Sequence, residues 1–281
     1  MKKLTIIGIV FFGILFTGLM GFAQDFQTSD LEGTWQLYMF ETDPVAGSSY
    51  YAYGSFTANE SGNVTAGTYN PPVGPAINVA GGTLSLDDDG ILSGSIDAEG
   101  GIKITFPSGK LDADKNILTY VANPSTGAMD FGLAIKDGGS FSTSDLEGTW
   151  HVYLVESNPV AGSYWLYGSF TVDDSGNITE GTYNAPDGTT VNVTGGLFSL
   201  DSSGVVTGTV DAEGGLKGTF PSGKMGADKY IITFIGNDTN GSMDLGVAVK
   251  AGLPQPSEDN TEGSGGGGGG GGGCFISTMN K

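Results

Sequence analysis

The sequence predicts an all-β protein built from two tandem antiparallel β-barrels of about eight strands each. Three observations carry this prediction. The segment TSDLEGTW begins at Thr28 and again at Thr143, and the similarity continues to Gly138 and Gly252, so the chain contains one domain-sized unit twice. Each unit consists of short segments in which polar and apolar residues alternate. Turns rich in Gly, Asn and Asp separate these segments, and none of the segments keeps a helical period.

Each repeat offers the same series of candidate strands. In the first repeat they span 34–41, 51–58, 63–70, 77–86, 90–97, 102–106, 117–122 and 129–136. Several strands end in an Asp- or Asn-rich turn from which the next strand leaves, as in GSFTANESGNVTAGTY, and such residues tolerate the positive φ of tight hairpins. The Pro-Ser-Gly segments at 107–109 and 221–223 are expected as hairpin turns.

Consecutive hairpins with short loops form an antiparallel meander. An open meander leaves two unpaired edges, and closure into a barrel removes both. Eight strands suit a barrel whose interior is filled by side chains or holds one small ligand. The many glycines within the strands fit the sharp bends of a small barrel. An open two-sheet sandwich is the structural alternative.

The first residues predict export. Lys2 and Lys3 precede an uncharged stretch, and small residues around Ala23 suit cleavage before Gln24, so residues 1–23 are interpreted as a signal peptide. The apolar stretch is also long enough to span a bilayer, so an uncleaved anchor is the alternative. The expected location is extracellular, on a bacterial cell surface or in the periplasm.

Residues 28–138 and 143–252 are expected to form the two barrels, and residues 253–281 a disordered Gly-rich tail that ends in a CFIST tag. The only cysteine, Cys274, lies in that tail. Neither repeat therefore contains a disulfide, and each must be stable through its hydrophobic core alone.

The net charge of −20 restricts the partners. Binding to nucleic acid requires clustered Lys or Arg, whereas this chain contains no Arg. The same charge disfavours adsorption to anionic lipid. We expect no nucleic-acid partner, and the charge serves solubility or attracts cations and basic partners.

Each repeat opens with LEGTW and later contains GTY, and this order resembles the Gly-x-Trp opening and third strand of lipocalins and their avidin-like relatives, the calycin group. In these families a basic residue of the last strand packs over the tryptophan. The resemblance implies Lys136 over Trp35 and Lys250 over Trp150 as structural signatures. It also implies an exported binding protein. Avidin's biotin pocket needs several later tryptophans, and the chain has only three in all, so that site is not carried over.

The C-terminal tail resembles a second known protein segment. A glycine run followed by Cys274 and FIST is similar to the start of the CFI-box segment found at the C-terminus of some exported bacterial proteins. Members continue through Ala and Tyr-Gly, whereas this chain ends at Met-Asn-Lys. The resemblance implies attachment to the cell envelope through Cys274. A passively exposed thiol is the alternative.

Most catalytic and metal sites fail the test of appearing in both repeats. The only histidine, His151, corresponds to a glutamine in the first repeat, which excludes a zinc site and a Ser-His-Asp relay. Asp97 and Glu99 do recur as Asp211 and Glu213 in the shared DAEGG segment. Paired acids of this kind allow a glycosidase or a weak structural calcium site, but at a strand end they are expected to face solvent. We expect no enzyme activity, no cofactor and no metal centre.

The aromatic residues of the second strand give the strongest binding signal. This strand reads YYAYGSF in one repeat and YWLYGSF in the other. Alternation places Tyr51 and Tyr53, and their counterparts Trp165 and Tyr167, on the face opposite the core. We predict ligand binding by these residues, with a small hydrophobic molecule or a surface glycan as partner. The alternative is a structural or adhesive surface protein with solid barrels, in which these rings serve packing.

Overall fold

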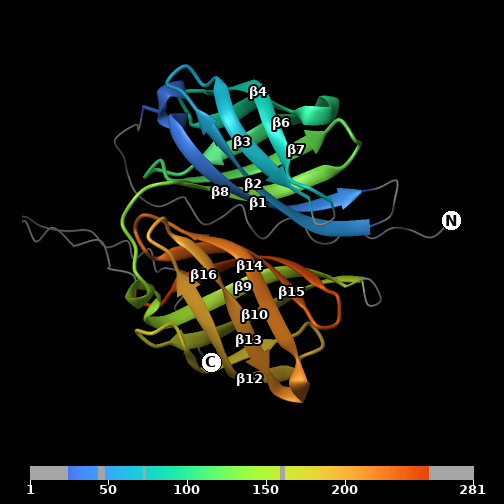
Figure 1. Cartoon of the computed structure of the whole chain (residues 1–281), viewed down its shortest axis with the longest axis vertical. Helices are drawn as coiled ribbons and strands as arrows, with labels where there is room; N and C mark the ends of the chain where they lie inside the picture. Colours follow the sequence, from blue (N-terminus) through green and yellow to red (C-terminus); the bar gives the residue numbers. More distant parts are fainter. Residues whose placement is uncertain (1–24, 44–47, 72–73, 159–161, 253–281) are drawn as a thin grey trace, which may run out of the picture. The chain divides into compact units, whose positions relative to one another are not determined.

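The computed structural model describes residues 25–43, 48–71, 74–158 and 162–252 (Figure 1). The predicted signal peptide and tail, including Cys274, lie outside these residues. The first repeat begins with a short 3-10 helix, Thr28–Leu31, and another, Glu99–Gly101, follows its fifth strand. Its strands are β1 (Gly33–Asp43), β2 (Ser48–Ala58), β3 (Val64–Asn70), β4 (Ile77–Leu86), β5 (Ile91–Ala98), β6 (Ile102–Leu111), β7 (Ile117–Pro124) and β8 (Met129–Lys136).

The second repeat follows the same plan, with 3-10 helices at Thr143–Leu146 and Glu213–Gly215. Its strands are β9 (Gly148–Asn158), β10 (Gly162–Val172), β11 (Ile178–Asn184), β12 (Thr190–Leu200), β13 (Val205–Ala212), β14 (Lys217–Met225), β15 (Ile231–Asp238) and β16 (Met243–Lys250).

Each repeat forms a closed barrel of eight antiparallel strands in meander order, which confirms the predicted fold class. Barrel 1 closes where β8 pairs with β1, and barrel 2 closes where β16 pairs with β9. Closure leaves no unpaired sheet edge, which excludes the open sandwich. Both barrels belong to one compact unit of the chain that ends at Ala251.

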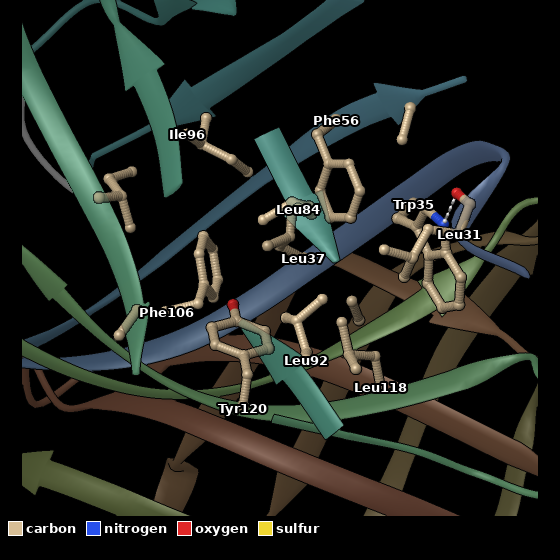
Figure 2. Close-up of a cluster of buried hydrophobic side chains, with 14 of the residues drawn as sticks. Leu31, Trp35, Leu37, Phe56, Leu84, Leu92, Ile96, Phe106, Leu118 and Tyr120 are labelled. Carbon is tan, nitrogen blue, oxygen red and sulfur yellow. Dashed lines mark hydrogen bonds between the residues drawn. The ribbon is translucent and has the colours of Figure 1, made fainter. Parts of the chain in front are cut away.

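Alternating side chains fill the interior of barrel 1. Along β1, Trp35, Leu37 and Met39 point inward and are at most 6% exposed. They pack against side chains from the other strands, among them Phe56 and Leu84 (Figure 2). Every strand of barrel 1 contributes at least one residue to this core, and most contribute alternate residues, as expected for a strand with one buried face.

The prediction of a hairpin turn at the Pro-Ser-Gly segments was wrong. Residues 107–109 continue β6, and the pairing of β6 with β7 shifts its register between Thr105 and Ser108. Proline has no N–H to donate to a ladder, so it is tolerated in a strand where a bulge interrupts the pairing. The same shift occurs in β14 between Thr219 and Ser222. The segment therefore bends a barrel strand.

Helices contribute little to the described residues. None of the helices in the described part of the chain has the length and apolar character needed to cross a membrane.

Candidate functional site

The aromatic residues predicted to bind a ligand lie on the outside of the barrels. In β2, Ala52 and Phe56 point into barrel 1 and are 0% and 1% exposed. Because side chains alternate along a strand, Tyr51 and Tyr53 project from the outer surface. The rings of Tyr51 and Tyr53 therefore have no access to the interior of the barrel.

In barrel 2 the equivalent rings are open to solvent. Trp165 and Tyr167 of β10 are 50% and 46% exposed, and their ring centroids lie 5.8 Å apart with the planes tilted by 35°. Across the β9–β10 pairing, Tyr153 lies opposite Tyr167 and Val155 opposite Trp165. These neighbours are 52% and 45% exposed. The four side chains together form an uncharged apolar surface, which we call the β9–β10 face.

The same surface of barrel 1 is covered by barrel 2. This β1–β2 face consists of Tyr38, Phe40, Tyr51 and Tyr53. Its members Tyr38 and Tyr51 are only 2% and 9% exposed, because they pack in one cluster with side chains of β15 and β16. The covering residues are Ile235, Met243 and Leu245, which form the β15–β16 face. The chain thus contains a protein–protein contact between its own two barrels.

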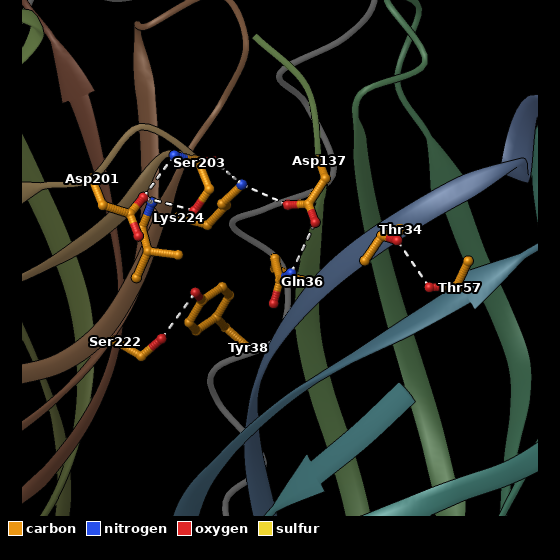
Figure 3. Close-up of polar contacts among 10 residues, drawn as sticks. Thr34, Gln36, Tyr38, Thr57, Asp137, Asp201, Ser203, Ser222 and Lys224 are labelled. Atoms are coloured by element: carbon orange, nitrogen blue, oxygen red, sulfur yellow. Dashed lines mark hydrogen bonds and ion pairs between the residues drawn. The ribbon is translucent and has the colours of Figure 1, made fainter. Parts of the chain in front are cut away.

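Hydrogen bonds accompany this apolar contact. The hydroxyl oxygens of Tyr38 and Ser222 lie 3.1 Å apart, within hydrogen-bonding distance (Figure 3). The side-chain amide of Asn237 donates to the Tyr51 hydroxyl at 3.2 Å. Both tyrosines therefore bury their rings and keep a partner for the polar end, which is the usual way in which tyrosine serves an interface.

An ion pair between a buried lysine and a partly exposed aspartate lies beside these hydrogen bonds. The ammonium group of Lys224 lies 2.6 Å from a carboxylate oxygen of Asp137, and the lysine side chain is 0% exposed (Figure 3). Lys224 also donates to the carbonyl oxygen of Ser203, and the other Asp137 oxygen accepts from the amide of Gln36 at 3.1 Å. The charge of Lys224 is thus paired and hydrogen-bonded, as a buried charge requires.

The cores of the barrels hold very little space. The cavity in barrel 2, lined by Trp150 and Phe220 among others, has a volume of about 20 Å³. The cavity in barrel 1, which Tyr69, Tyr120 and Asp130 help to line, also measures about 20 Å³. A volume of this size holds about one water molecule.

The signature tryptophans are buried beside the first 3-10 helix of each barrel. The Trp35 side chain is fully buried, and its indole N–H donates to the carbonyl oxygen of Leu31 at 2.9 Å (Figure 2). The Lys136 ammonium lies 5.4 Å from the centre of the Trp35 ring and donates to the Asp30 carbonyl at 2.9 Å. Lys136 thereby covers the indole and ties the last strand to the first 3-10 helix.

Barrel 2 repeats the same contacts. The Lys250 ammonium lies 5.4 Å from the Trp150 ring centre and donates to the Asp145 carbonyl. The Trp150 indole donates to the Leu146 carbonyl at 2.7 Å. These tryptophans and lysines therefore serve the fold and are not part of an open binding surface.

The structure also reveals a buried pair of acids that the sequence analysis missed. Glu41 of β1 lies opposite Asp130 of β8, and the two side chains are 3% and 4% exposed. The Tyr69 hydroxyl donates to the Glu41 carboxylate at 2.7 Å, and the Tyr50 hydroxyl donates to its other oxygen. Neither carboxyl oxygen of Asp130 has a hydrogen-bond partner among the described residues. Burial, and secondarily the charge of Glu41, raise the pKa of Asp130 to about 8.

Barrel 2 contains the equivalent pair. Glu156 lies opposite Asp244, the side chains are 5% and 8% exposed, and the Tyr164 hydroxyl donates to Glu156. Burial, and secondarily the charge of Glu156, raise the pKa of Asp244 to about 8. The pairs could have been found from the sequence, because each acid occupies an inward position in the alternation of its strand. Their enclosure keeps them from contact with solvent or a substrate in this structure.

The DAEGG acids, in contrast, lie on the surface. Asp97 forms an exposed ion pair with Lys103 at 3.0 Å, and Glu99 accepts from the amide of Asn78 at 3.1 Å. In the second repeat Asp211 and Glu213 have equivalent partners, Lys217 at 3.4 Å and Asn192 at 2.9 Å. Within the described residues, no group of three or more His, Cys, Asp or Glu side chains is placed to hold a metal ion. His151 is exposed on β9.

No protein-family model matches the chain, and no curated protein matches it. Solved structures resemble it weakly. A redesigned β-barrel is 16% identical, with 40% of this chain and 96% of that chain covered and a TM-score of 0.31. A protein of unknown function from the DUF3598 family of Nostoc punctiforme is 11% identical over 80% of this chain and 99% of that one, with a TM-score of 0.31. Transferrin binding protein B from Neisseria meningitidis is 13% identical over 72% of this chain and 53% of that one, with a TM-score of 0.36.

Proposed function

We propose that this chain is an exported, non-enzymatic binding protein of the structural or adhesive kind, which acts through the outer surface of solid barrels. The observation that carries the proposal is that equivalent surfaces of the two repeats differ in their exposure to solvent. The β1–β2 face of barrel 1 is buried against another barrel, whereas the equivalent β9–β10 face of barrel 2 is exposed.

The β9–β10 face has the chemistry of a protein-docking surface. Tyr153, Trp165 and Tyr167 are rigid side chains that offer large contact areas, and aromatic residues of this kind are enriched at the centres of protein interfaces. The corresponding residues of barrel 1 already make such a contact within this chain. A second apolar surface of the same design on the same molecule is best explained by a second macromolecular contact.

The interior of the barrels argues against a carried ligand. Pockets for small molecules usually measure about 300–1,000 Å³, whereas the cavities in the two barrel cores measure about 20 Å³ each. A small hydrophobic cargo would need the core side chains to move apart. The chain acts without catalysis in this proposal, because the DAEGG acids are paired on the surface and the other two acid pairs are enclosed.

A surface glycan is the second candidate partner, and one observation favours it. The exposed rings of Trp165 and Tyr167 lie 5.8 Å apart, which would allow adjacent sugar rings to stack on them. Titration of the purified chain with chitin and cellulose oligosaccharides, followed by tryptophan fluorescence, separates the two candidates. Saturable quenching that Trp165→Ala abolishes would establish the glycan, and an unchanged spectrum is the result we expect.

Two experiments test the leading proposal. A native mass spectrum of the chain isolated from its own host should contain no small molecule that dissociates on denaturation, and such a molecule would overturn the solid-barrel reading. The labelled chain should also bind to washed envelope of its host, and the double substitution W165S/Y167S should abolish this binding. Leu197→Ser is the matched control, because Leu197 is 49% exposed but lies on β12. Equal binding by all three proteins would refute a role for the β9–β10 face.

A further inference from the structure

The surface that covers the β1–β2 face also occurs twice in the chain. In barrel 2 the β15–β16 face lies in the strands IITFIGND and MDLGVAVK, and its members Ile235 and Leu245 are 0% and 5% exposed. The matching strands of barrel 1 are ILTYVANP and MDFGLAIK. At the same positions these strands present Val121, Met129 and Phe131, which we call the β7–β8 face.

The β7–β8 face is open to solvent. Val121, Met129 and Phe131 are 42%, 53% and 42% exposed. Val121 and Phe131 lie opposite each other in the β7–β8 pairing, so the three side chains form one patch. The chain thus has two complementary surfaces, each present in both barrels, and uses only one copy of each in its internal contact.

The two unused faces have kept the character of the used ones while their residues changed. On the aromatic side, Trp165 stands in the place of Tyr51 and Val155 in the place of Phe40. On the other side, Phe131 stands in the place of Leu245. None of these exchanges introduces a charge or a polar side chain, although a surface that met only water would accept either at little cost.

We propose that the exposed β9–β10 face of one copy binds the exposed β7–β8 face of a second copy, in the same way as the two barrels contact each other within the chain. This inference rests on the proposed function and names the partner of the same face: a second copy of this chain. The internal contact supplies the template, because each free face matches, residue by residue, a face that is already buried against its complement.

The polar groups of the template are also available. The Tyr38–Ser222 hydrogen bond has its counterpart in Tyr153 and Ser108, which are both exposed. The Asn237–Tyr51 hydrogen bond has its counterpart in Asn123 and Trp165. Here the direction reverses, because the indole N–H is a donor and the side-chain oxygen of Asn123 accepts.

One element of the template is missing at the contact between copies. Lys224 and Asp137 form an ion pair in the internal contact. The equivalent positions at the contact between copies are Lys110 and Ala251, and alanine has no carboxylate with which Lys110 could pair. The contact between copies is therefore weaker than the internal one and reversible. Two copies that each carry a net charge of −20 also repel each other, so added salt strengthens an apolar contact between them.

The contact is heterologous, because it joins two different faces. Head-to-tail contacts of this kind propagate until they close as a ring or continue as a fibre. In barrel 1 the used and unused faces lie on neighbouring strand pairs, since β8 pairs with β1. Successive contacts therefore do not lie along one straight line, and the assembly of barrels is curved.

The test is the oligomeric state of the purified full chain, measured by sedimentation velocity over a range of concentrations. The wild-type protein should associate reversibly, and more strongly as NaCl is raised. The variants W165S/Y167S and M129S/F131S should each weaken association at least about tenfold, as loss of central interface anchors does. Leu197→Ser should leave it unchanged, and Ala251→Asp should strengthen it by restoring an ion pair with Lys110. Thermal unfolding checks that each variant is folded.

Mixing the two inactive variants gives the decisive result. Each variant lacks a different face, so one intact β9–β10 face and one intact β7–β8 face remain in the mixture. The two variants should therefore form a dimer that neither forms alone, and this dimer cannot grow because its outer faces are the mutated ones. If association is lost only in W165S/Y167S, and mixing the two variants does not restore it, then two β9–β10 faces bind each other. That result would overturn the proposal. A monomer at every concentration would also overturn it. If envelope binding nevertheless depends on Trp165 and Tyr167, the proposed function stands and its partner is another protein.

Discussion

Glu41 and Asp130 face each other across the β1–β8 pairing inside barrel 1, and almost no part of either side chain reaches solvent. Glu156 and Asp244 repeat this relationship in barrel 2. Two acids enclosed at one position of each barrel make the stability of the fold depend on pH. The direction follows from the protonation of the two aspartates.

Burial raises the pKa of Asp130 and of Asp244 from the ordinary 3.8 to about 8. Between these values the folded protein holds protons that the unfolded chain has lost. The contribution of each aspartate to the free energy of unfolding should therefore be highest below pH 4. It should fall by at most about 1.4 kcal/mol per pH unit as the pH rises toward 8, and it should level off above pH 8. Urea unfolding from pH 5 to pH 9 measures the slope.

The double variant D130N/D244N is the control for this pH dependence. An amide cannot ionise, so the variant should lose the slope and exceed the wild-type stability at pH 9. Equal slopes for the two proteins would show that other groups cause the pH dependence.

Lys136 should stabilise barrel 1 through its charge. Lys136→Met keeps the aliphatic cover over Trp35 but removes the ammonium group and its hydrogen bond to the Asp30 carbonyl. We expect a loss of about 1–2 kcal/mol in the free energy of unfolding. Lys103→Met, which breaks only an exposed ion pair with Asp97, should cost less than about 0.5 kcal/mol. A neutral result for Lys136→Met would mean that the aliphatic cover alone matters.

One position should respond differently in the two repeats. Tyr51→Ala removes a ring that is 9% exposed and packed between the barrels, and it should destabilise the chain by about 2–3 kcal/mol. Trp165→Ala removes the equivalent ring, which is 50% exposed, and should change stability by less than about 0.5 kcal/mol in dilute solution. Urea unfolding at low protein concentration compares the two. A large loss for Trp165→Ala would contradict an exposed β9–β10 face.

Asp137 should matter mainly because it pairs with the buried Lys224. Asp137→Ala leaves the lysine charge enclosed without its partner, which should cost about 2 kcal/mol, since Asp137 itself is partly exposed. The double variant D137A/K224M, which removes both charges, should recover most of this loss. Chemical denaturation of the three proteins gives the coupling between the two residues. An additive double variant would show that the ion pair contributes nothing.

The sequence was sufficient for the overall fold and for the faces of its strands. Phe56 at an inward position already assigned Tyr51 and Tyr53 to the outer surface, and alternation alone carries that information. The same rule could have found Glu41 and Asp130, because both occupy inward positions. Local patterns misled at Pro107, where a residue typical of turns lies at a bulge within a strand, since both turns and bulges tolerate a residue that has no N–H to donate.

The sequence by itself determined that two similar all-β units follow each other and which side chains point out of them, because strand periodicity and turn chemistry are local properties. In the sequence, Tyr51 and Trp165 occupy the same position of the two repeats, and nothing local distinguishes their exposure. Only the tertiary structure decided that one is buried between barrels and the other is exposed. The reason is physical: two copies of one fold present the same pair of complementary faces, and a single contact between them can use each face only once.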